Sequence, residues 1–114
     1  MRAALFCLAL VCGLHSPTLA LANRVYAGQE AVALRCANAL ALTATALAGA
    51  GRISEQEKDV MLWITVSILK RHVSGTWWQK KSALRVMQTR RTAIQTLDDY
   101  RVNAQKCLEQ FPIN

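Results

Sequence analysis

The sequence has few residues that interrupt helices and few that carry negative charge. Proline occurs twice and glycine five times among 114 residues, and no alternating run of β-branched and aromatic residues marks a strand. Ala and Leu are abundant instead, so we expect an all-α fold. Seven acidic residues stand against 14 basic ones, and their spacing selects no carboxylate pair for hydrolysis.

The motifs of common catalytic and cofactor chemistry are also missing. The sequence has no Gly-rich phosphate loop, no G-x-S-x-G elbow and no C-x-x-C pair. His72 could join Met61 and Met87 in a soft metal site. Both methionines fall on apolar helical stripes, however, and we interpret them as packing residues. We therefore predict no enzyme activity, no cofactor and no metal site.

The first 22 residues have the pattern of a cleaved signal peptide. Arg2 precedes an apolar segment over 3–14, Pro17 interrupts the helix after this segment, and the Ala-Leu-Ala of 20–22 matches a cleavage signal. The apolar segment is short for an uncleaved anchor, which needs about 20 residues. We expect cleavage after this signal, a periplasmic or secreted protein, and a single helical domain over 23–114.

Cleavage would remove two of the four cysteines. Cys7 and Cys12 leave with the signal peptide, while Cys36 and Cys107 enter an oxidising compartment. Without a redox or zinc pattern, these two predict one structural disulfide. Loss of Arg2 leaves 13 basic residues against seven acidic ones, a net charge of +6 for the mature chain.

The first expected helix, over 28–48, is apolar on nearly all its faces. Only Glu30 and Arg35 are charged, and the Gly-Ala-Gly of 49–51 ends it. Such a helix lies either at the centre of its bundle or against a second copy of the chain, so a homodimer through it stays open. A membrane span is disfavoured by Arg35 and Asn38, and we expect no transmembrane helix in the mature chain.

Capping signals mark the starts of the next two helices. Ser54 with Glu57, and Thr76 with Gln79, have the spacing of a capping box. The second helix should therefore begin after Ser54 and end before the Ser-Gly of 74–75. The apolar side of the third helix is expected to consist of Trp77, Leu84 and Met87.

The end of the chain allows two interpretations. Periodicity fades after Met87, and we expect a break within 92–96 with Thr96 as the N-cap of a fourth helix. A single long helix over 77–110 is the alternative. The apolar stripe expected for the fourth helix is Leu97, Tyr100, Ala104, Cys107, Leu108 and Phe111.

Four helices joined by short loops predict a small up-down-up-down antiparallel bundle with both termini at one end. Cys36 then lies about two turns into the first helix and Cys107 about one turn from the end of the last. At ~1.5 Å per residue, the two heights differ by roughly 6–8 Å. The bundle is therefore compatible with the predicted disulfide.

One stretch of the chain carries positive charge alone. Between Val60 and Leu97 there are seven basic residues and no acidic one. Trp78, Lys81 and Arg85 share one face of the third helix, and Trp and Arg often anchor interfaces. These three residues are the predicted partner-binding face. The alternative is an ordinary solvated surface on which Trp78 covers the end of the bundle.

These observations favour a non-enzymatic exported binding protein of the inhibitor, immunity or envelope-complex accessory type. The expected partner is another protein; an acidic envelope surface is a second class. Nucleic acid is not expected, because an exported protein seldom meets it. The alternative function is a periplasmic stress chaperone for unfolded clients, suggested by the small size and the apolar first helix.

Overall fold

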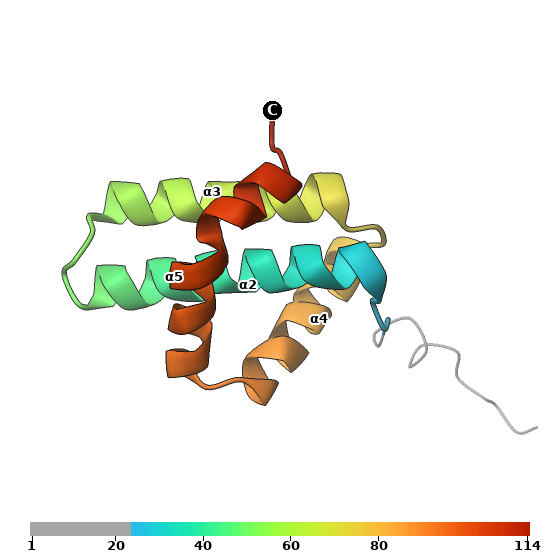
Figure 1. Cartoon of the computed structure of the whole chain (residues 1–114), viewed down its shortest axis with the longest axis horizontal. Coiled ribbons are helices and arrows are strands. Elements are labelled where there is room, and N and C mark those ends of the chain that lie inside the picture. Colours follow the sequence, from blue (N-terminus) through green and yellow to red (C-terminus); the bar gives the residue numbers. More distant parts are fainter. Residues whose placement is uncertain (1–23) are drawn as a thin grey trace, which may run out of the picture.

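The computed structural model describes residues 24–114, so the predicted signal peptide over 1–22 lies outside the described residues. This part of the chain contains four helices and no strand (Figure 1). The all-α prediction is confirmed, and the stretch over 77–110 forms two helices rather than one. The helices are α2 (Gly28–Gly49), α3 (Glu55–His72), α4 (Trp77–Arg90) and α5 (Ala93–Gln110).

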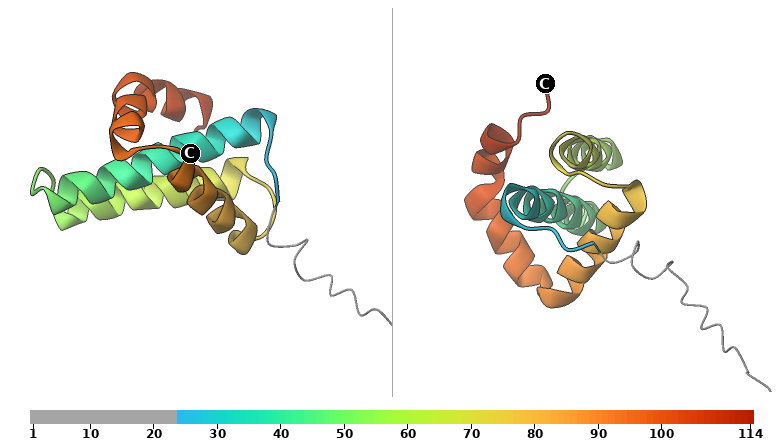
Figure 2. Two further views of the ribbon diagram at one scale, coloured as in Figure 1. Left: turned by 90° about the horizontal axis from the view of Figure 1, so that it is seen from below. Right: turned by 90° about the vertical axis from the view of Figure 1, so that its right-hand side faces the viewer.

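α2 lies at the centre of the fold. α3 runs antiparallel beside it, and α4 and α5 pack on other sides of α2 (Figure 2). Because different faces of α2 meet different helices, it needs apolar side chains almost all round. The central position predicted for this helix is confirmed, whereas a homodimer through it stays a prediction. α2 is also long and apolar enough to cross a membrane, but half of its most apolar window is buried within the fold.

The bundle departs from a simple up-down-up-down course after α3. α4 slants across α2, and α5 turns back and crosses α2 steeply (Figures 1 and 2). The extensive helix–helix contacts within 24–114 all involve α2. α4 reaches α3 through a hydrogen bond from Lys80 to the carbonyl oxygen of Leu69, but it does not pack extensively on α3 or on α5. The extended backbone of Arg91 and Thr92 separates the axes of α4 and α5. The predicted four-helix bundle is confirmed, although α4 and α5 cross α2 at an angle instead of lying alongside it.

Capping boxes begin three of the four helices. Those at Ser54 and Thr76 are confirmed, with the side chain of each residue accepting from the backbone three residues ahead. The third box was misplaced in the prediction: Thr92, not Thr96, is the N-cap of α5, and it pairs with Gln95. Thr96 is instead buried within the first turn, where its hydroxyl donates to the carbonyl oxygen of Thr92 at 3.1 Å.

The core forms where α2 meets the end of α3 and the last residues of the chain. Leu84 and Met87 pack against it as predicted, but Trp77 does not, since 47% of its surface is exposed. Trp77 is the first residue of α4, and α4 reaches the core only through later turns. The buried members of the cluster are Ala33, Leu34, Cys36, Ala37, Leu40, Ile68, Leu69, Val73 and Phe111.

A disulfide joins α2 to α5. Cys36 and Cys107 are bonded, and their Cα atoms lie 5.7 Å apart, within the usual range for disulfides. Cys36 belongs to the buried core, and the two cysteines are 71 residues apart in sequence. The predicted pairing is confirmed at the level of geometry, and it fastens the last helix to the central one.

Candidate protein-binding face

The start of α4 is fixed by a hydrogen-bond network around Ser74. The backbone N–H and the hydroxyl of Ser74 both donate to Glu30 on α2, at 2.5 and 2.7 Å. Arg24 donates to the Ser74 hydroxyl at 2.6 Å, and the Tyr26 hydroxyl donates to the Ser74 carbonyl at 2.8 Å. The two donors of Ser74 hold the pKa of the Glu30 carboxyl below its usual range. The loop before α4 is thereby attached to the start of α2.

Adjacent lysines on α4 have different roles. Lys80 is buried, and its ammonium donates to the carbonyl oxygen of Leu69 at 3.0 Å. This carbonyl lies in the last turn of α3, where a cation also suits the helix dipole. Lys81 instead points toward the exposed side, so only one of the two lysines can contribute to an external surface.

The three predicted binding residues do lie together on α4. Trp78 has 70% of its surface exposed, and the Lys81 ammonium lies 5.4 Å from the centroid of its ring, within cation–π range. Arg85 is exposed one turn further along the same face. We call these three residues the α4 basic face. Trp78 therefore packs little on the bundle, whereas an ordinary solvated surface stays the alternative for this face.

A second exposed apolar feature lies on α3 and was missed in the sequence analysis. Val60, Trp63 and Val66 are exposed and lie three residues apart, with 61% of Trp63 accessible. Their spacing was visible, but the sequence does not show which side of α3 is left open by α2. We call these three residues the α3 apolar stripe.

The only histidine within 24–114 is engaged in packing. Its Nε2 lies 2.7 Å from the carbonyl oxygen of Pro112, and its ring meets Phe111 edge-on with centroids 5.3 Å apart. His72 therefore holds the end of the chain against α3. No cluster of three or more His, Cys, Asp or Glu side chains suited to a metal ion occurs in this part of the chain.

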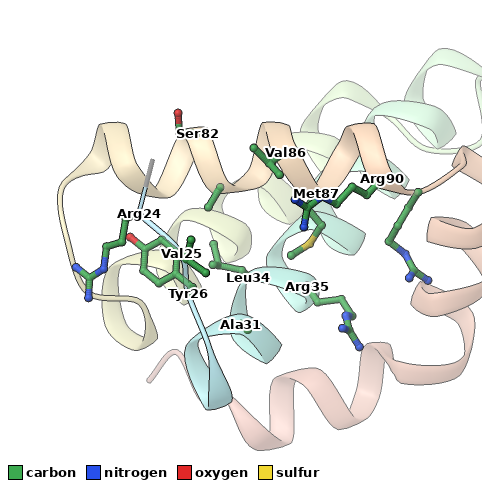
Figure 3. Close-up of a pocket in the computed structure, with 12 residues that line it drawn as sticks. Arg24, Val25, Tyr26, Ala31, Leu34, Arg35, Ser82, Val86, Met87 and Arg90 are labelled. Carbon is green, nitrogen blue, oxygen red and sulfur yellow. The ribbon is translucent and has the colours of Figure 1, made fainter. Parts of the chain in front are cut away.

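An open groove lies between the first half of α2 and the second half of α4. Its volume is about 510 Å³. Tyr26, Leu34 and Met87 gather in its middle, while Arg24 lies at one end and Arg35 and Arg90 lie toward the other (Figure 3). We call this the α2–α4 groove. It depends on the angle at which α4 crosses α2, which no local sequence pattern specifies.

Comparisons with known proteins give this chain no relative from which a role could be carried over. No family model, no curated protein and no solved structure matches it. Its function must therefore be argued from its own surface.

Proposed function

We propose that this chain is a non-enzymatic exported binding protein that docks through the α4 basic face onto an acidic patch of another protein. The observation that carries the proposal is a highly exposed Trp78 whose ring lies beside the Lys81 ammonium, on a helix without acidic residues that also exposes Arg85 on the same face. Tryptophan and arginine contribute disproportionately to binding energy at protein interfaces. An inhibitor, an immunity protein or an accessory subunit of an envelope complex would work in this way.

The anchoring of the start of α4 supports this proposal. Its first turn is fixed by the Thr76 capping box and by the Ser74 network, so Trp78 is presented by a helix whose start is anchored at two points. A preorganised surface loses less conformational entropy on binding than a mobile one. The excess of basic residues would also speed encounter with an acidic partner at low ionic strength.

The test compares two variants, each of which lacks one exposed tryptophan and one cation, on different helices. Trp78→Ala/Arg85→Ala removes the α4 basic face, whereas Trp63→Ala/Lys70→Ala removes one exposed tryptophan and one cation from α3. Equal melting temperatures would show that both variants fold. We expect the α4 variant alone to lose its partner in quantitative pull-downs from periplasmic extract. Equal recovery of every partner by wild type and by the α4 variant would refute the docking face.

A stress chaperone is the second candidate, and the α3 apolar stripe favours it. Exposed apolar surface of this kind can hold unfolded chains. Trp63→Ser should then weaken suppression of client aggregation, while Trp78→Ser should not. If suppression and dye binding stay flat across pH and on reduction of the disulfide, this candidate is removed.

Export is a separate part of the proposal and can be tested by mass. The intact mass of the exported protein, measured without reductant, should correspond to residues 23–114 less the two hydrogens lost on forming one disulfide. Retention of residues 1–22, or two free thiols in exported protein, would contradict export and oxidation as described.

A further inference from the structure

The α2–α4 groove combines an apolar floor with four arginines, two of which have no carboxylate partner among residues 24–114. Its volume of about 510 Å³ falls within the usual range of small-molecule sites. The floor is formed by Leu34 from α2, Met87 from α4 and the ring of Tyr26, which converge on the same space (Figure 3). A ligand seated there would bury apolar surface in a partly enclosed site.

The four arginines that line the groove fall into two groups. Arg24 is engaged with Ser74 and lies 4.0 Å from Glu30, and Arg91 forms an ion pair with Asp99. Within residues 24–114, the structure shows no ion pair and no hydrogen bond for the guanidinium groups of the other two arginines. These are Arg35 and Arg90.

Arg91 adds an independent sign of unmet hydrogen-bonding capacity at this end of the groove. Its Nε is buried and has no hydrogen-bond partner among the described residues, although its terminal nitrogen pairs with Asp99. A buried donor without a partner is unfavourable. Arginine forks match carboxylate and phosphate oxygens especially well.

We propose that the α2–α4 groove binds a single-chain amphipathic anion, an aliphatic chain that ends in a carboxylate or phosphate. The chain lies on the floor formed by Leu34, Tyr26 and Met87, and the acidic group lies at Arg35 and Arg90. Unpaired positive charge toward one end and an apolar floor in the middle are the complement of such a ligand. At the other end, the charge of Arg24 is already engaged by Ser74 and Glu30. This inference goes beyond the proposed docking function.

The groove and the α4 basic face are separate surfaces of the same helix. Ala83, Met87 and Arg90 line the groove and follow helical spacing along one side of α4. Trp78 and Arg85 are not among the residues that line it. The two sites can therefore be disabled one at a time.

The first experiment measures binding to the wild-type protein by titration calorimetry. The probes are dodecanoate, dodecyl phosphate, butyrate, inorganic phosphate and dodecyl maltoside, each below its micelle concentration. We expect the two long-chain anions to bind and the short-chain, free-phosphate and neutral probes to bind at least tenfold more weakly. Between butyrate and dodecanoate, affinity should rise by up to roughly fourfold for each methylene that becomes buried. Equal affinity for butyrate and dodecanoate, or for dodecanoate and dodecyl maltoside, would overturn the proposal.

The second experiment removes the proposed anion contacts. Arg35→Gln/Arg90→Gln should weaken dodecanoate binding by at least about tenfold, because charge-assisted hydrogen bonds are lost. The matched control, Arg52→Gln/Arg101→Gln, removes the same charge from exposed positions that do not line the groove. An equal loss in both pairs, or no loss in the first, contradicts the assignment.

The variant of the α4 basic face separates this inference from the proposed function. Trp78→Ala/Arg85→Ala should bind dodecanoate as wild type does, and Arg35→Gln/Arg90→Gln should still recover the protein partner. Loss of dodecanoate binding in the first variant would refute the groove as a separate site. That result would not bear on the docking proposal, which the recovery of the protein partner tests separately.

Discussion

Removal of the Cys36–Cys107 disulfide should lower the stability of this fold substantially. The disulfide closes a loop of 71 residues. In the chain-entropy description, a loop of this length constrains the unfolded chain by about 4 kcal/mol at 25 °C. A small domain has a total free energy of unfolding of about 5–15 kcal/mol, so this is a substantial share.

The assay is urea unfolding followed by far-UV circular dichroism on three samples: oxidised wild type, reduced wild type, and Cys36→Ala/Cys107→Ala. The reduced protein and the variant should both lose about 4 kcal/mol, and reductant should leave the variant unchanged. Amide exchange should show α5 losing protection before α2 and α3, because α5 packs mainly on α2. A loss below about 1 kcal/mol in both samples would refute the reasoning that the disulfide constrains the unfolded chain.

Three further changes test the local structure around α4 and α5. Gly75→Ala should destabilise by at least about 1–2 kcal/mol in a thermal melt, because φ is +92° and a Cβ would lie 2.5–2.9 Å from three side chains. Gly49→Ala, where a Cβ meets nothing within 4 Å, is the control that should not destabilise. The Ser74 donors lower the folded-state pKa of Glu30, so the ionised carboxylate stabilises the protein above its unfolded pKa, and this contribution is lost as pH falls through the folded pKa. In Glu30→Gln, the decrease of stability at acidic pH should therefore be less steep than in wild type. An unchanged decrease would exclude a stabilising role for the Glu30 carboxylate. Thr92→Ala should cost about 1 kcal/mol in urea unfolding through loss of its cap, and no measurable loss would contradict the assignment of the α5 start.

The parts of the fold that depend on local chemistry could be predicted from the sequence. Ser54 and Thr76 begin helices because the hydroxyl and the side chain three residues later satisfy backbone N–H groups within one turn. Thr92 and Thr96 illustrate the limit of this approach. Three residues after Thr92 comes Gln95, and three residues after Thr96 comes Asp99. Either side chain could complete a capping box, so the local pattern alone does not show which threonine begins the helix. Asp99 instead forms an ion pair with Arg91.

The candidate sites depend on tertiary geometry and were harder to predict. Helical spacing placed Trp78, Lys81 and Arg85 on one face, but the exposure of Trp78 depends on where α4 leaves α3. Lys80 is buried and Lys81 is not, and this difference in burial depends on the position of the Leu69 carbonyl, to which Lys80 donates. The α2–α4 groove could not be predicted, because it exists only at the observed crossing of two helices.

The central claim is that the α4 basic face carries the binding function. Its most direct test is the dissociation constant of the recovered partner for wild type, Trp78→Ala/Arg85→Ala and Trp63→Ala/Lys70→Ala. Truncation of an interface anchor typically costs about 2 kcal/mol or more, so the α4 variant should bind at least tenfold more weakly while the α3 variant binds as wild type does. Equal dissociation constants for the two variants would contradict the claim.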